Sequence, residues 1–333
     1  MNEVSRRGFV GSALAGMAAL TASNAGAQQA AGQAPVDAKP FRDPFVYHFK
    51  IGELDAYSIS DCDLGLGEGL DLMWPQEDRP KMKDEMIRHG ERMGPLPLYV
   101  NILVVRSGDD VLLFDAGFGK GNNPKMGWLQ EGLAAVGISP DQVTAGFLSH
   151  AHADHLNGFV NHGKPAFPNA VVYLLEDELA FWRKPEPDFS KSKRNKGAIP
   201  GMIKEVRGHF DTLQEKLRPV KPGTEVLGGL VRIEGAPGHT DGHACFRVRS
   251  GNDELLHLMD LAHHHLLMFA DPNWTIAFDH DPIVAVETRK KYWTEAVEKR
   301  TRCMGFHLPW PGLGHIVTEG NGYRWAIEAW RWG

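Results

Sequence analysis

The chain has 333 residues, of which 42% are hydrophobic and 23% are charged, and its formal net charge at pH 7 is −6. These proportions are ordinary for a globular protein, and a single sandwich-like domain can reach this length. A negative net charge gives no electrostatic reason to expect a nucleic-acid partner, which would favour a basic face.

Residues 1–27 have the pattern of an export signal. Ser5–Val10 (SRRGFV) matches the twin-arginine pattern, a mildly apolar stretch follows to about Ala22, and Ala25–Ala27 has the small residues of a cleavage site. The apolar stretch is too short and too weak to remain as a membrane anchor. We therefore expect the twin-arginine export machinery to deliver a periplasmic or secreted bacterial protein without a membrane anchor after processing.

Residues 28–44 are expected to form a linker, and residues 45–333 one domain. The domain opens with two predicted hairpins, whose strands are expected at 46–50, 55–59, 99–106 and 111–114. The segment 61–98 between the hairpins lacks a regular pattern but carries several large apolar residues. We interpret it as a lid or substrate wall, with simple packing against the sandwich as the alternative.

A short motif close behind the apolar segment Ala145–Leu148 contains four potential metal ligands. They have the spacing H-x-H-x-D-H and are His150, His152, Asp154 and His155. A loop that leaves a strand end can direct alternate side chains into a common space, and imidazole with carboxylate suits zinc or a similar divalent ion. We interpret this motif as a metal site.

Three later segments also place potential ligands at the ends of apolar, strand-like runs. A glycine-rich turn supplies His239, and the strand from Leu255 ends on Asp260. A late segment offers both His307 and His315. We expect these strand ends to converge on one rim, where they would complete a metal centre.

Helical spacing is found at 128–136, 176–182, 202–217 and 283–300, and a strand is expected at 171–174. Pairs of strands closed by helices predict an α/β protein, a four-layer αββα sandwich with the metal site along one edge.

Two features have no chemical role in this interpretation. The basic run Lys191–Lys196 is taken as a solvated loop, with an anion site as the alternative. Three scattered cysteines are too few for a disulfide framework, although one pair remains an alternative among Cys62, Cys245 and Cys303.

Together these motifs resemble those of the metallo-β-lactamase-fold hydrolases. The H-x-H-x-D-H motif, the Gly-His-Thr turn, the strand-end aspartate and the late histidine occur in the family's order, and Asp115–Gly117 resembles its early Asp-x-Gly element. His307–Ile316 and Glu319–Arg324 resemble in particular the methyl parathion hydrolase and quorum-quenching lactonase branch. The resemblance covers roughly residues 45–324 and implies the metallo-β-lactamase fold.

The resemblance implies two Zn²⁺ ions per chain, with other divalent ions as alternatives. The first ion would be held by His150, His152 and His239, the second by Asp154, His155 and His307, and both by a bridging Asp260. The match favours His307 over His315 for the last place. It also implies that His243 is a turn residue and that Asp115 supports the metal loop by orienting the ligand histidines.

The implied chemistry is hydrolysis by metal-bound hydroxide, because a bound metal ion lowers the pKa of water from 15.7 to about 7. Asp154 or Asp260 would orient the hydroxide and shuttle its proton. The expected substrate is a small apolar molecule, aromatic molecules included, with an ester or lactone bond or, second, a phosphotriester bond.

Three alternatives remain at this stage. Hydrolytic displacement on an activated aromatic ring would use the same hydroxide. A non-hydrolytic, iron-dependent oxidoreductase of the same fold is the second, although the diiron branch resembles H-x-E-x-D where this chain has His152–Asp154. The third is a metal-binding protein that has lost catalysis.

His263 is a further catalytic candidate, three positions after Asp260. The lactonase branch has a tyrosine at this offset that contacts the substrate, and an imidazole there could donate a hydrogen bond to a developing oxyanion. The alternative is that His263 only packs or binds solvent. The sequence also leaves open whether the protein forms a homodimer.

Overall fold

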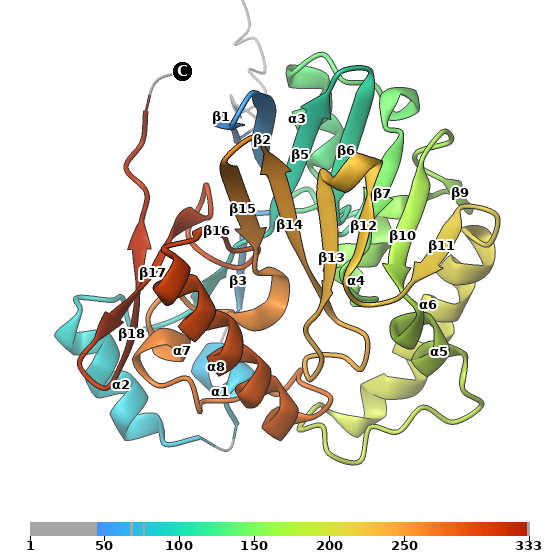
Figure 1. The fold of residues 1–333 in the computed structure, drawn as a ribbon. Coiled ribbons are helices and arrows are strands. Elements are labelled where there is room, and N and C mark those ends of the chain that lie inside the picture. Colours follow the sequence, from blue (N-terminus) through green and yellow to red (C-terminus); the bar gives the residue numbers. More distant parts are fainter. Residues whose placement is uncertain (1–44, 67–68, 76, 332–333) are drawn as a thin grey trace, which may run out of the picture. The chain divides into compact units, whose positions relative to one another are not determined.

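The computed structural model describes residues 45–66, 69–75 and 77–331 (Figure 1). The export signal and the linker predicted for residues 1–44 lie outside the described residues. The described residues belong to one unit, Asp43–Gly333. Within them, no helix combines the length and the apolar character needed to cross a membrane.

Two seven-stranded sheets form the centre of this unit. The first has the strand order β1 (Val46–Ile51), β2 (Leu54–Ser60), β5 (Asn101–Ser107), β6 (Asp110–Phe114), β7 (Ala145–Phe147), β10 (Val171–Leu175), β11 (Leu217–Val220). The β1–β2 and β5–β6 pairs are antiparallel, which confirms both predicted hairpins. From β6 to β11 the neighbouring strands run parallel.

The second sheet is antiparallel except at one pair, β15 and β16, which run parallel. Its order is β12 (Thr224–Val226), β13 (Val231–Gly235), β14 (Ala244–Ser250), β15 (Asp253–His257), β16 (Arg302–Met304), β17 (Leu313–Glu319), β18 (Gly322–Ile327).

The two sheets pack face to face through aromatic side chains. Phe114 and Phe147 of the first sheet stack with ring centroids 4.7 Å apart. Phe246 of the second sheet meets them edge-on, at 5.4 and 5.7 Å. Because β5 is covered on both faces, its residues from Asn101 to Val105 are all buried.

Helices cover the outer face of each sheet (Figure 1). The first sheet contacts α3 (Leu129–Ala135) and α5 (Glu176–Arg183), and α6 (Ile199–Thr212) packs on α5. The second contacts α7 (Leu267–Ala270) and α8 (Pro282–Lys299). These layers confirm the predicted αββα sandwich.

Local sequence explains where α8 begins and ends. Asp281 caps its N-terminus by accepting hydrogen bonds from the backbone N–H groups of Ile283 and Val284, and Pro282 occupies the first turn. The helix ends at Arg300, which adopts a left-handed conformation with φ 52°. The helix predicted at 283–300 is confirmed.

The helix predicted for 202–217 is wrong at its end. The helix α6 ends at Thr212, and Leu217 begins β11. Leu213 and Leu217 are both buried. Their four-residue spacing therefore resembles a helical face, although the second leucine belongs to the sheet.

The segment 61–98 contains regular structure that its sequence did not indicate. It forms α1 (Gly69–Met73), α2 (Arg79–Arg88) and a small sheet of β3 (Leu64–Leu66) and β4 (Leu96–Leu98). Trp74, Met82 and Met86 are buried in a core cluster with residues of the second sheet. One side of this segment therefore packs against the sandwich.

Candidate metal centre

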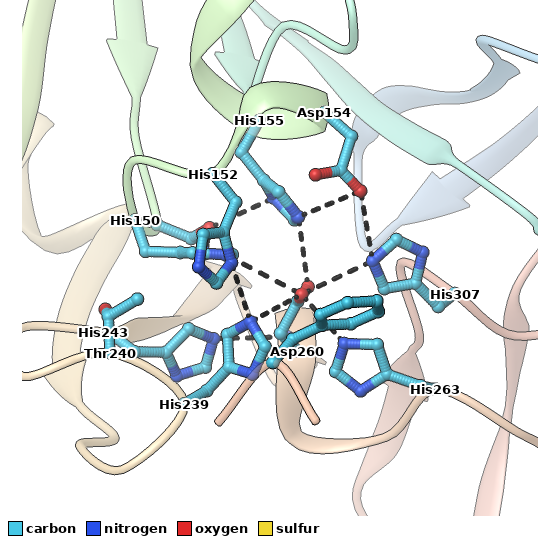
Figure 2. A network of polar contacts seen from close by, with 12 residues as sticks. His150, His152, Asp154, His155, His239, Thr240, His243, Asp260, His263 and His307 are labelled. Atoms are coloured by element: carbon cyan, nitrogen blue, oxygen red, sulfur yellow. Dashed lines mark hydrogen bonds and ion pairs between the residues drawn. The ribbon is translucent and has the colours of Figure 1, made fainter. Parts of the chain in front are cut away.

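The predicted ligands meet where loops leave the ends of both sheets (Figure 2). The H-x-H-x-D-H loop follows β7 of the first sheet. His239, Asp260 and His307 follow β13, β15 and β16 of the second. All of these side chains except Asp154 are buried.

The loop after β7 is shaped by a backbone turn and by Asp115. His152 is extended and precedes the one-turn helix α4 (Ala153–Leu156). One carboxylate oxygen of Asp115 accepts a hydrogen bond from the backbone N–H of Ser149 at 2.7 Å. The other lies 2.6 Å from Nδ1 of His155. Asp115 thus orients the loop and one of its histidines, as the sequence implied.

The first group of ligand atoms is formed by three histidines and one aspartate. Nδ1 of His152 lies 2.8 Å from Nε2 of His150 and 2.9 Å from Nε2 of His239. Oδ2 of Asp260 lies 3.1 Å from Nε2 of His239. These four residues offer ligand atoms that all lie within 4.8 Å of one another.

Asp154, His155 and His307 form the second group. Oδ2 of Asp154 lies 3.4 Å from Nε2 of His307 and 3.6 Å from Nε2 of His155. Asp260 reaches this group as well, with Oδ1 3.2 Å from His155 Nε2 and Oδ2 3.3 Å from His307 Nε2. Its carboxylate therefore lies between the two groups, where the bridging role places it.

The electrostatics of the cluster suit a cation. Burial lowers the pKa of His150 and of His152 well below its ordinary value, so neither favours a proton. Burial alone would raise the pKa of Asp260, but the imidazoles of His155 and His307 around it reverse that effect. Nε2 of His155 and Oδ1 of Asp260 are buried without a hydrogen-bond partner. Unsatisfied atoms of this kind, aimed at one space, fit a metal ion.

Asp260 differs from its predicted position. The strand expected to end on this residue stops at His257, and residues Met259–Leu261 form a tight turn in which Met259 has φ 48°. His243 holds this turn, because its Nε2 accepts a hydrogen bond from the backbone N–H of Asp260 at 3.1 Å. His243 is therefore a turn residue, as expected.

Most of the predicted ligand histidines have an acceptor for their second ring nitrogen. Nδ1 of His155 faces Asp115, and that of His307 lies 2.7 Å from the carbonyl oxygen of Tyr99. Nδ1 of His239 lies 2.9 Å from Asp279. The partners Asp279 and Tyr99 were missed by sequence reasoning, since neither lies in a ligand motif. His315, the rejected alternative, lies in β17 outside the cluster.

Glu178 is a second missed residue, and it joins two metal loops. Its buried carboxylate accepts hydrogen bonds from the backbone N–H of Ala151 at 2.8 Å and from the Thr240 hydroxyl at 2.5 Å. It also accepts from Trp182 Nε1 and from the backbone N–H of Gly242. No signal in the sequence separates Glu178 from Glu176 and Asp177, the other acidic residues in the first turn of α5.

A cavity of about 400 Å³ opens onto the cluster. Asp154, Asp260 and His263 line it. Its walls are largely apolar and include Leu66, Met73, Leu98, Phe118, Met202, Val206 and Phe278. The first three come from the segment 61–98, which therefore forms part of the cavity wall as well as packing against the core.

His263 lies directly beside the predicted bridging residue. Its Nε2 is 3.0 Å from Oδ2 of Asp260, and its ring stacks on His307 with centroids 4.8 Å apart. Asp260, His263 and His307 form a third group able to hold a metal ion. The structure thus places His263 at the cavity, and its catalytic role stays a prediction.

The basic run Lys191–Lys196 is a solvated loop only in part: Lys191, Asn195 and Lys196 are exposed, whereas Lys193 and Arg194 are partly buried. Lys193 contacts Glu77 and the Thr275 hydroxyl, both at 2.8 Å. Arg194 lines the cavity, and its Nη2 lies 2.8 Å from Nε2 of His152. Lys193 turns inward to partners on other segments, and Arg194 turns inward to the cavity. By contrast, Cys62, Cys245 and Cys303 are buried free thiols.

Comparisons with known proteins agree with this geometry. Residues 95–299 match the family model of the metallo-β-lactamase superfamily. The chain belongs to this superfamily, which confirms the resemblance, the fold and the class of hydrolytic enzyme. No curated protein matches the chain.

Several solved structures share the fold. AidC, a dizinc quorum-quenching lactonase solved with a product, is 28% identical with a TM-score of 0.82, and the match covers 86% of this chain and 98% of AidC. The hydrolase AbOPH of the β-lactamase superfamily is 24% identical with a TM-score of 0.79, covering 87% of this chain and 100% of that one. A probable metal-dependent hydrolase from Staphylococcus aureus is 16% identical with a TM-score of 0.67, covering 84% and 99%.

Proposed function

We propose that this protein is a dinuclear, zinc-dependent hydrolase of carboxylic esters or lactones. The observation that carries the proposal is the position of Asp260 between two groups of ligand atoms that open onto an apolar cavity. The likeness to AidC supports lactones among the candidate substrates, because AidC is a lactonase.

The residues fit zinc. Five imidazoles and two carboxylates match the nitrogen and oxygen ligands that zinc takes in catalytic sites, and the cluster holds no thiolate. When bound, the ions supply a nucleophile at neutral pH and stabilise negative charge on the substrate oxygen.

The chain's own residues would do the remaining work. The apolar walls, with Phe118 and Phe278, exclude water and hold the acyl group. Asp154 is partly exposed to the cavity, so its carboxylate is positioned to accept the proton of the attacking water. His263 lines the cavity with its Nε2 3.0 Å from Oδ2 of Asp260, and it would donate a hydrogen bond to the oxyanion that develops on the carbonyl oxygen once the substrate displaces this contact.

A substrate panel with metal analysis tests the proposal. We expect about two zinc ions per purified chain, and faster hydrolysis of N-acyl homoserine lactones and 4-nitrophenyl esters than of a phosphotriester. Prolonged dialysis against a chelator should abolish the hydrolysis, and added zinc should restore it. Zinc-loaded protein that hydrolyses no ester or lactone, or a bound iron with redox activity, would contradict the proposal.

A further inference from the structure

Arg194 lines the cavity, and its guanidinium has few hydrogen-bond acceptors around it. It belongs to the loop between α5 and α6, and its guanidinium carbon lies 4.9 Å from the centroid of the Phe278 ring. Its Nη2 also approaches the carbonyl oxygen of Phe278, at 3.4 Å. Its Nε is buried and has no hydrogen-bond partner among the described residues. An unsatisfied donor of this kind costs free energy until an acceptor arrives.

No carboxylate neutralises this guanidinium at close range. Within residues 45–66, 69–75 and 77–331, no carboxylate oxygen lies within 4.0 Å of the nitrogens of Arg194. Two neighbouring lysines of the same loop do have such partners, since Lys191 pairs with Asp281 and Lys193 with Glu77. A guanidinium stays charged in proteins, and a partly buried charge without a carboxylate in contact is costly, although Asp154 and Asp279 act on it from a longer distance.

The contact between Arg194 and His152 depends on which nitrogen of His152 carries the proton. Nδ1 of His152 is the atom that faces His150 and His239, so it is the ligand atom. A ligand nitrogen carries no proton, and the neutral ring then carries its proton on Nε2. That N–H faces the Nη2 of Arg194, which can only donate.

His152 is therefore the exception among the predicted ligand histidines. His155, His239 and His307 each present the second ring nitrogen to a carboxylate or carbonyl oxygen, and His150 presents it to the Ser149 hydroxyl at 2.9 Å. Ligand histidines ordinarily donate this N–H to an acceptor. At His152 the acceptor is missing, because Nε2 faces Nη2 of Arg194, a second donor, and both residues line the cavity.

We propose that this space binds a carboxylate carried by the substrate, with Arg194 as the residue that recognises it. A carboxylate accepts several hydrogen bonds at once, and it would satisfy Nε and Nη2 of Arg194 together with Nε2 of His152. The space lies a full imidazole ring away from the ligand nitrogen of His152. The carboxylate is thus a second group of the substrate, a few bonds from the carbonyl that is attacked. This inference rests on the proposed hydrolase function and narrows its substrate class to anionic esters or lactones.

Ligand binding to zinc-loaded protein tests the inference without turnover. Isothermal titration calorimetry would compare glutarate, glutaramate and butyrate, which share one carboxylate for the metal ions and differ at the other end. We expect glutarate to bind most tightly, and Arg194→Met to weaken glutarate roughly ten- to a hundredfold while leaving butyrate little changed. Arg194→Lys keeps the positive charge but lacks the paired N–H donors of the guanidinium, so it should retain part of the preference for glutarate.

Two controls test whether the weaker glutarate binding comes from the loss of Arg194 itself or from a general loss of charge or of zinc. Arg183→Met removes the same charge from α5, where Arg183 pairs with Asp211, and should leave the three affinities unchanged. Zinc content should match the wild type in both Arg194 variants. Equal affinities for the three ligands, a preference for glutaramate, an equal loss for all three ligands, or loss of zinc in both Arg194 variants would overturn the inference.

Ester hydrolysis separates a failure of the proposed hydrolase function from a failure of carboxylate recognition by Arg194. The mono-4-nitrophenyl ester of glutarate should be hydrolysed with a higher kcat/KM than 4-nitrophenyl butyrate, and Arg194→Met should remove this advantage mainly through KM. If the protein hydrolyses neither these esters nor any lactone of the panel, the proposed function fails, and the calorimetric comparison still decides whether Arg194 recognises a carboxylate.

Discussion

At the scale of single residues, Asp260 differs from the other predicted ligands because it alone is assigned to both groups of ligand atoms. The carboxylate of Asp260 lies within 3.6 Å of ring nitrogens in His150, His155, His239 and His307. Of the two groups assigned to the predicted ions, each of those histidines belongs to one. Removing Asp260 should therefore disturb both metal positions at once.

Asp260→Ala should lower the metal content from about two ions per chain to one or fewer. Loss of a partner outside the ligand set typically costs 10–100-fold, so loss of this ligand should reduce kcat/KM by more than roughly a hundredfold. Metal analysis and ester hydrolysis measure the two effects. Asp109→Ala, in the exposed turn between β5 and β6, is the control. Two fully occupied metal positions in Asp260→Ala would refute the bridging role.

His263→Ala should lower kcat by roughly 10²–10³-fold while both metals stay bound, as expected for the loss of an oxyanion donor. His265→Ala is a matched control, because His265 pairs with Glu91 and does not line the cavity. Steady-state kinetics and metal analysis read out the result. Lost metal would make His263 a ligand, and unchanged kinetics would make it a bystander.

At the scale of elements, α5 positions the metal loops through one side chain. Glu178 accepts four hydrogen bonds, from the loop after β7, from the turn after β13 and from its own helix. A carboxylate suits this position because it offers acceptors only. The helix is thereby part of the site, although it supplies no ligand.

Glu178→Gln should place an amide donor against these donors. We expect a loss of about 1–3 kcal/mol in the free energy of unfolding, measured by urea denaturation, together with weaker metal retention. Glu176→Gln changes the same charge on the exposed face of α5 and should have little effect. Equal stability of the two variants would show that Glu178 does not hold the loops.

The ligand residues and the residues that position them differ in how far the sequence could predict them. The ligand residues could be found from the sequence because each lies in or just after a strand-end run, where spacing is local. Arg194 lies in the basic run for which an anion site was the alternative, but only the structure singles it out. Glu178 and Asp279 could not be found, because packing between distant loops brings them to the cluster. Their neighbours in the sequence carry no pattern that anticipates this packing.

At the scale of the whole molecule, the sandwich was predictable because its buried strands and amphipathic helices have distinct periods. The small helices and strands of 61–98 were not, since α1 has five residues and β3 and β4 have three each. Segments this short depend on tertiary contacts rather than on a period.

Export remains a proposal that concerns residues outside the described part of the chain. Replacing both Arg6 and Arg7 with lysine should leave unprocessed protein in the cytoplasm, because the paired arginines are the feature that the twin-arginine route reads. Cell fractionation and immunoblotting measure this. Normal delivery of the double variant would show that another route reads the signal.

The predicted metal ligands come from both sheets, and this has a consequence for the stability of the fold. One loop belongs to the first sheet and three belong to the second, so bound metal would fasten the two sheets to each other. Any ligand that binds only the folded state stabilises it, by about 2.7 kcal/mol at a free concentration 100 times Kd. Demetallated protein should therefore melt at a lower temperature in scanning calorimetry, with zinc restoring the loss. In Asp260→Ala the rise in melting temperature on adding zinc should be smaller, because the metal centre that links the two sheets would have lost its bridging ligand.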